Sequence, residues 1–122
     1  MIQIDLPWPS KDLSPNSRCH WAVRARAVKK ARCDAMWFAH WRGWPFEGLD
    51  GDCDVVLTFS PPDKRRYDDD NLIARCKAYL DGIADALGVD DSRFRLGKPV
   101  RAESIKGGNV RVEIVAVETE AA

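Results

Sequence analysis

The pattern of apolar and polar residues in the first third of the chain predicts one strand and one long helix. In residues 2–6, IQIDL, isoleucine and leucine alternate with polar side chains as they do in a strand, and prolines follow. Residues 10–18 are rich in serine, proline and asparagine, which is typical of a loop. From residue 20 to residue 41 apolar side chains recur every three or four positions, which predicts a helix that ends before Gly43. We expect its apolar stripe to contain Trp21, Ala25, Val28, Ala31 or Arg32, Ala35 and Phe38.

A second strand and a second helix are expected in the middle of the chain. Residues 53–60, CDVVLTFS, are a strand candidate that two prolines close. A helix should begin at Asp69 or Asp70 and end at Gly88, because glycine is favoured just beyond a helix C-terminus. At about 100° per residue, its apolar side chains fall on one buried face. That face contains Leu72, Cys76, Leu80, Ile83 and Leu87.

Two further strands complete the pattern and indicate the fold class. Residues 98–105 are the weaker strand candidate, and the glycines of KGGN at 106–109 predict a tight turn before an alternating strand at 110–117. The order β-α-β-α-β-β indicates an α/β fold, a single small domain with a mixed sheet packed against two helices. We expect this domain to span residues 1–118 and residues 119–122 to form a frayed C-terminal tail.

The charges are balanced in number but unevenly placed. The 122 residues include 19 Lys and Arg and 19 Asp and Glu, yet residues 13–33 contain no acid and most acids lie after residue 50. This asymmetry suggests a basic face beside an acidic pocket, arranged to act on a polyanion. The alternative is an ordinary solvated charged surface. The basic residues of the acid-free segment are Arg18, Arg24, Arg26, Lys29, Lys30 and Arg32.

The cysteines and the hydropathy pattern bear on the compartment. The four cysteines form no CxxC pair and no zinc-ligand spacing, and we see no secretory leader before them. No segment approaches the roughly 20 apolar residues of a membrane helix. We therefore expect free thiols, a cytoplasmic location and no membrane partner.

The stretch KRRYDDDN, at residues 64–71, places three carboxylates side by side. A helix cap accounts for one or two of these acids, at roughly 1 kcal/mol, but not for all three. If the segment is extended, Asp68 and Asp70 point the same way, and converging carboxylates repel unless a proton or a cation lies between them. Mg²⁺ is the cation that prefers such oxygen ligands. Lys77 and Asp81 should share the helix face of Asp70.

A second acidic pair follows the helix, in the sequence VDDS. Asp90 or Asp91 would add a third metal ligand if the loop folds back beside Asp68 and Asp70. The alternative is an ordinary turn, or the cap of a short helical turn.

These motifs resemble the RusA-type Holliday junction resolvases. The resemblance covers most of the chain in the same order, through LPWP at 6–9, SPN at 14–16, DDDN at 68–71, KAYLD at 77–81, VDDS at 89–92 and KGG at 106–108. It implies a homodimeric Mg²⁺-dependent endodeoxyribonuclease, with Mn²⁺ as a possible substitute. Such an enzyme resolves four-way DNA junctions by paired nicks in recombination and repair.

The resemblance also implies roles for single residues. Asp68, Asp70 and Asp91 would be catalytic metal ligands, with Asp90 beside them, and Lys77 would be the catalytic lysine. The spacing from DDDN to this lysine is longer than in the family pattern by about one helical turn, so Lys77 stays on the Asp70 face of the helix. The alternative for Lys77 is a solvated lysine paired with the carboxylate four residues on.

DNA contacts would come from the SPN loop, the first helix and the basic residues before the acids. These are Asn16, Arg24, Arg26, Lys29, Lys30, Lys64, Arg65 and Arg66. Contacts of this kind are independent of base sequence and weaken as salt rises. Tyr67 stands where some family members have another basic residue.

Two other functions fit part of the pattern. A non-catalytic module that binds branched nucleic acid explains the basic helix but not the clustered acids, because carboxylates without a metal repel DNA. A structural or partner-binding protein explains DDDN as a cap alone. For the tryptophans at 37, 41 and 44 we expect core packing first, a dimer contact second and base stacking third.

Overall fold

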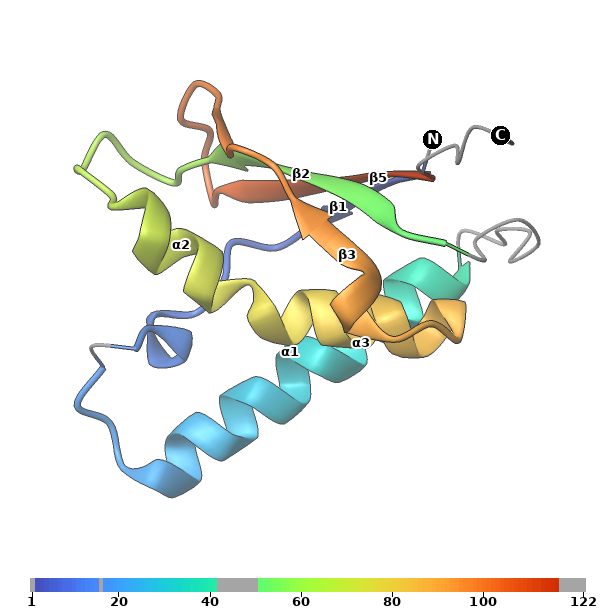
Figure 1. Ribbon diagram of the computed structural model, residues 1–122. Helices are drawn as coiled ribbons and strands as arrows, with labels where there is room; N and C mark the ends of the chain where they lie inside the picture. The colour runs from blue at the N-terminus through green and yellow to red at the C-terminus, as the bar shows by residue number, and fades with distance from the viewer. Residues whose placement is uncertain (1, 16, 42–50, 117–122) are drawn as a thin grey trace.

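The computed structural model describes residues 2–15, 17–41 and 51–116, in which helices cover one face of a mixed sheet (Figure 1). The helices are α1 (Trp21–Trp41), α2 (Asp69–Arg75) and α3 (Lys77–Leu87), with short 3-10 turns η1 (Lys11–Leu13) and η2 (Asp91–Arg93). The strands are β1 (Ile2–Leu6), β2 (Cys53–Ser60), β3 (Phe94–Leu96), β4 (Val100–Arg101) and β5 (Asn109–Ala116). The predicted α/β class with a mixed sheet is confirmed.

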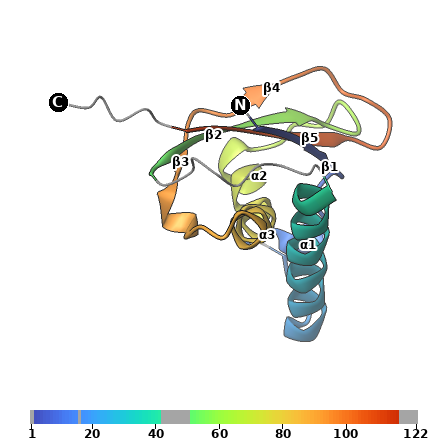
Figure 2. The ribbon, with the colours of Figure 1, turned by 90° about the vertical axis from the view of Figure 1, so that its right-hand side faces the viewer.

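Strand pairing explains why the sheet is mixed. The main order is β1-β5-β2-β3, and β4 also pairs with β2. Strand β5 runs antiparallel to both of its neighbours, whereas β3 and β4 run parallel to β2. In Figure 2 the three helices lie together on one side of the sheet. Helix α3 therefore has one side toward the sheet and another toward α1, and only its remaining side is open to a ligand.

The core lies between the sheet and α3, and it follows the predicted periodicities. Alternate residues of β2, from Cys53 to Phe59, are buried, as a sheet with one covered face requires. The predicted apolar face of the second helix is also confirmed, because all five of its side chains are buried. They are Leu72, Cys76, Leu80, Ile83 and Leu87.

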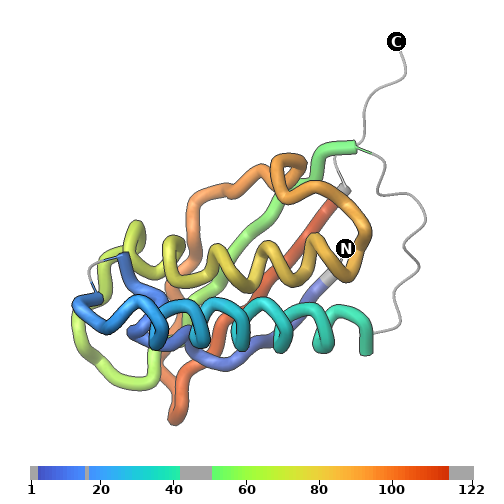
Figure 3. Tube along the Cα trace, turned by 90° about the horizontal axis from the view of Figure 1, so that it is seen from below, coloured from blue at the N-terminus to red at the C-terminus, as the bar shows by residue number. Residues whose placement is uncertain are grey.

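The predicted stripe of α1 is confirmed for Ala31 and Ala35 and wrong for its large side chains. This helix packs along α3 (Figure 3) through a row of small side chains, of which Ala31, Ala35 and Ala39 are buried. Trp21, Val28 and Phe38 are exposed instead. The reason is a close approach of the two helices, because a larger side chain would not fit between them. Core packing of Trp37 and Trp41 is likewise wrong, since both rings are more than half exposed, and Trp44 lies outside the described residues.

The second predicted helix is broken into two. The chain leaves the α2 helix at Cys76 and starts α3 at Lys77, while Gly88 ends α3 in a left-handed conformation (φ 68°) as predicted. The strand predicted at 98–105 is only partly present. Within that range only β4 is a strand, and β3 precedes it. Both pair with β2, at opposite ends, and the N–H of Gly97 between them still donates to the carbonyl of Val55.

The last predicted strand is present as β5, which begins one residue earlier than the alternation indicated. The glycines before it, Gly107 and Gly108, both have positive φ and make the expected turn. The predicted tail at 119–122 lies outside the described residues. Among the described helices, none is long and apolar enough to cross a membrane.

Candidate functional site

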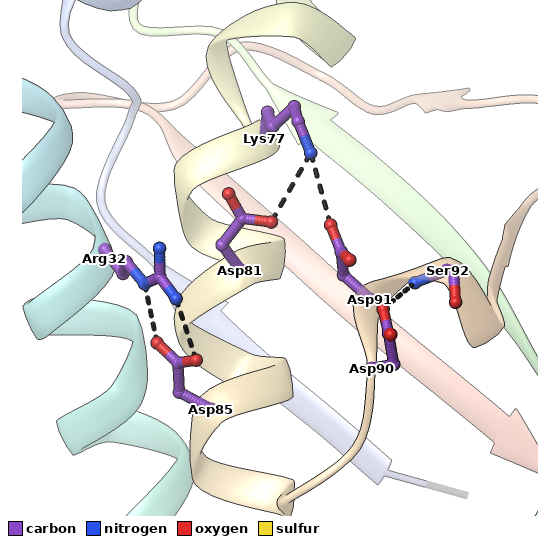
Figure 4. Close-up of polar contacts among 7 residues, drawn as sticks. All are labelled: Arg32, Lys77, Asp81, Asp85, Asp90, Asp91 and Ser92. Carbon is purple, nitrogen blue, oxygen red and sulfur yellow. Dashed lines mark hydrogen bonds and ion pairs between the residues drawn. The ribbon is translucent and has the colours of Figure 1, made fainter.

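Three side chains that lie apart in the sequence meet at the start of α3 (Figure 4). The Nζ of Lys77 lies 3.4 Å from Oδ1 of Asp81 and 3.2 Å from Oδ2 of Asp91. Asp81 stands one helical turn after Lys77, and Asp91 is the first residue of η2. The lysine is therefore not only a solvated helix lysine with an i+4 partner, because a second carboxylate reaches it from another element.

The connection between α3 and η2 brings Asp91 to this place. Gly88 reverses the chain, and the N–H of Val89 donates to the carbonyl of Ala84, which ties the connection to the last turn of α3. Asp90 then caps η2, since its carboxylate accepts from the N–H of Ser92 at 3.0 Å. Asp90 thus has the local capping role that the sequence left open, and Asp91 is the acid that faces α3.

The close contacts move the pKa values of all three groups. Burial, followed by the hydrogen bond with Asp91, raises the pKa of Asp81 above its ordinary value. The hydrogen bond with Asp81, followed by that with Lys77, lowers the pKa of Asp91. The hydrogen bond to Asp91 raises the pKa of Lys77. As pH falls, Asp81 therefore takes up a proton before Asp91 does.

Two hollows adjoin this cluster. One is polar, has a volume of about 340 Å³, and is bordered by the ion pair between Arg32 and Asp85, whose atoms approach to 2.6 Å. The other, of about 190 Å³, is lined mainly by apolar side chains of α2, α3 and β3 and shares Lys77 and Asp91 with the first. The charged pair therefore stands between a polar and an apolar hollow.

The three adjacent acids lie at the start of α2. Asp68 is the N-cap residue, with extended backbone, but its side chain makes no capping hydrogen bond, and both Asp68 and Asp70 are exposed. Asp69 accepts from Nε of Arg101 at 2.8 Å. Asn71 donates to the hydroxyl of Ser14 at 2.7 Å, which ties DDDN to the SPN loop.

The structure does not gather the predicted metal ligands into one group. Asp91 lies with Lys77 and Asp81, whereas Asp68 and Asp70 lie at the start of α2. Within residues 2–15, 17–41 and 51–116, no three His, Cys, Asp or Glu side chains are close enough together to hold a metal ion. The donor chemistry suits Mg²⁺, because all the acids offer hard oxygen ligands. In the described residues these acids stand in two sets, Asp68 with Asp70 and Asp91 with Asp81.

The predicted DNA-binding residues are mostly exposed, and some have partners within the chain. Arg24 donates to the carbonyl of Ser14 at 3.0 Å and so helps to hold the loop. Lys30 pairs with Asp34 at 2.7 Å, and Arg65 pairs weakly with Asp63 at 3.7 Å. Asn16 lies outside the described residues. The remaining predicted DNA-binding residues are exposed, namely Arg26, Lys29, Lys64 and Arg66.

Two residues of these sites were missed in the sequence. Asp81 was placed on the face of Asp70 and Lys77 but given no catalytic or metal-binding role, although it also interacts with Asp91. Arg101 gave no signal, because it reaches Asp69 across 32 residues from a two-residue strand. The i+4 spacing was a signal for Asp81, whereas nothing in the local sequence identifies Arg101.

Comparison with known proteins gives one informative match. No family model matches the chain. A protein of Xylella fastidiosa (strain Temecula1), described as uncharacterized, is 46% identical over 123 residues, which cover 99% of this chain and 80% of that protein. The chain therefore belongs to the same family as this Xylella fastidiosa protein.

Proposed function

We propose that this protein is a RusA-type, Mg²⁺-dependent endodeoxyribonuclease that resolves four-way DNA junctions by paired phosphodiester hydrolysis. The observation that carries the proposal is the 3.2 Å contact between Lys77 and Asp91. The resemblance assigns these two residues to the catalytic centre from separate motifs, and the fold brings their side chains into contact. A homodimer and a cytoplasmic location belong to the same proposal, and the free cysteines of the described residues agree with a reducing compartment.

Hydrolysis of a phosphodiester requires an attacking water, neutralisation of the phosphoryl oxygens and a stabilised leaving alkoxide. The ammonium of Lys77 is the group that would donate to a phosphoryl oxygen as negative charge develops there. Asp81 holds this ammonium from within α3, and Asp91 holds it from η2. A divalent cation, when bound, would supply the charge neutralisation and a water of lowered pKa.

The separation of the acids sets a condition on this proposal. Asp68 and Asp70 lie at the start of α2, and Asp91 is held by Lys77. Asp68, Asp70 and Asp91 would hold one cation together only if η2 and the start of α2 lay closer to each other than in this structure. Lys77 would be the group that contacts the phosphate.

The basic residues around the site fit a polyanionic substrate. Lys64 and Arg66 are exposed on the segment that leads into the acids, and Arg26 and Lys29 are exposed on α1. Such side chains bind phosphates without reading the bases, so the affinity should fall as salt rises.

The test is a nicking assay on a synthetic four-way junction, with and without Mg²⁺. We expect symmetric metal-dependent nicks, and a loss of about 100-fold in rate in Lys77→Met and Asp91→Asn with junction binding retained. Asp54→Asn is the matched control, because Asp54 is a surface carboxylate that pairs with Arg95 on the sheet at 3.6 Å. Full nicking by Asp91→Asn would contradict the proposal.

The second candidate is a module that binds branched nucleic acid without cutting it. One observation favours it: no three-carboxylate group is assembled in the described part of the chain. This candidate predicts junction binding with no nicks at any Mg²⁺ or Mn²⁺ concentration. If the protein has no affinity for junctions at all, both candidates fail.

A further inference from the structure

Arg101 joins the edge of the sheet to the acidic start of α2. It is the last residue of β4, which pairs in parallel with the end of β2, Phe59 opposite Arg101 (β4 is labelled in Figure 2). The N–H of the next residue, Ala102, donates to the carbonyl of Phe59 at 2.9 Å. Because Phe59 is fully buried, the backbone of Arg101 is held by the core.

The guanidinium of Arg101 donates hydrogen bonds to the residues immediately before and after Asp68. Its Nε donates to the carboxylate of Asp69 at 2.8 Å, and its Nη2 donates to the carbonyl of Tyr67. Asp68 lies between these two acceptors in an extended conformation, and its own carbonyl accepts from the N–H of Leu72 at 3.0 Å. The arginine therefore holds the chain where it enters the first turn of α2.

We propose that Arg101 is a positioning residue, which fixes Asp68 and Asp70 by holding Asp69 and the Tyr67 carbonyl. This inference rests on the proposed function, because it assigns a purpose to the geometry of the acids. Asp69 then has a structural role as the partner of Arg101, and it is not a cation ligand. The three adjacent acids thus divide into one that anchors the segment and two that remain available.

Charge and access support this division. Three neighbouring carboxylates repel one another, and a guanidinium on the middle one relieves that repulsion without covering the other two. Asp68 and Asp70 are exposed, and an open hollow of about 700 Å³ is lined by Asp68, Asp69 and Arg101 together with Arg66 and Tyr67. A phosphate group entering this hollow would meet Asp68 in a fixed position.

The test measures junction nicking by Arg101→Gln. We expect the rate at saturating junction to fall about tenfold with little change in KM, because misplaced acids impair the reaction more than the binding. Arg111→Gln is the matched control, since Arg111 makes a similar ion pair with Asp5, at 3.0 Å, on another part of the sheet. Nicking by Arg101→Gln equal to that of Arg111→Gln would overturn the proposal.

A double-mutant cycle separates positioning from direct DNA contact. If Arg101 acts through Asp69, then Arg101→Gln combined with Asp69→Asn should lose no more activity than the stronger single variant. If Arg101 instead contacts a phosphate, the two losses multiply and the salt dependence of binding falls by about one charge. The second result would overturn the positioning role.

Amide hydrogen exchange provides a readout that does not depend on nicking. Without the guanidinium, the first turn of α2 should open more often, so the Leu72 amide should exchange several-fold faster in Arg101→Gln than in Arg111→Gln. Faster exchange in a protein that never nicks DNA would refute the proposed function but not the role of Arg101 in holding the start of α2. Unchanged exchange at Leu72 would overturn that role of Arg101.

Discussion

Helices α1 and α3 approach each other closely at Gly82, and replacing this glycine by alanine tests the packing of the helices directly. A Cβ added at Gly82 would lie 2.1 Å from the carbonyl oxygen of Arg32 and 3.0 Å from the Cβ of Ala35. Favourable contacts between such atoms lie near 3.5 Å, so the oxygen is more than 1 Å too close. The obstacle is backbone, which cannot rotate away as a flexible side chain would.

Two opposing contributions decide the effect of Gly82→Ala. Alanine is favoured over glycine in a helix by about 1 kcal/mol. Overpacking in a closely packed interface costs about 1–3 kcal/mol, and sometimes more. Because the clash here is with backbone, we take the upper part of that range and expect a net loss of about 2 kcal/mol in the free energy of unfolding.

Urea denaturation followed by circular dichroism measures this loss as a lower midpoint at an unchanged slope. Ala25→Gly is the companion variant, because Ala25 is an exposed position inside α1 and reports helix propensity alone, at a cost of about 1 kcal/mol. If Gly82→Ala instead raised stability by that same amount, the helices would not approach as closely as described. The explanation for the alanine row of α1 would then fail.

Three shorter predictions concern the charged groups and the thiols. If Asp70 and Asp91 bind the same cation, Asp70→Asn and Asp91→Asn should each weaken Mg²⁺ binding measured by calorimetry. Unchanged binding in either variant would argue against a shared cation. Arg32 lowers the pKa of Asp85, so their pair stabilises the fold above the ordinary carboxyl pKa, and that contribution is lost as pH falls through the lowered value. Thermal unfolding of Arg32→Gln should therefore depend less on pH in acid. With a thiol reagent, exposed Cys33 should react at once and the buried thiols only on unfolding.

The sequence predicted best those elements whose burial follows from their own periodicity. Strand β2 was predicted with the correct bounds, because alternation over Cys53–Ser60 is what one covered sheet face requires. The apolar face of the second helix was also correct, since only one face of that segment carries large apolar side chains. In both cases the residues that pack are the largest ones available, so no knowledge of the neighbouring element was needed.

The same reasoning failed for the large apolar side chains of α1, because α3 approaches so closely that only small side chains fit between the two helices. The large apolar side chains of this helix recur at helical spacing, but so do its alanines. The choice between the two faces depends on Gly82, which lies some fifty residues along the chain and lets α3 approach too closely for a larger residue than alanine. The exposed rings of Trp37 and Trp41 are the consequence, because α3 packs on the alanine row instead.

The break at Cys76 shows which parts of the candidate site a helical projection can predict. Asp81 lies one turn beyond Lys77 within α3, so their contact depends only on local helix geometry, and the structure contains it. Asp70 lies in α2, on the other side of the break, although the shared buried face of Leu72 and Leu80 shows that the projection still holds across it. Asp91 reaches Lys77 through a turn that no helical spacing describes. The helical projection therefore accounts for Asp81 beside Lys77, whereas the approach of Asp91 depends on the connection that follows Gly88.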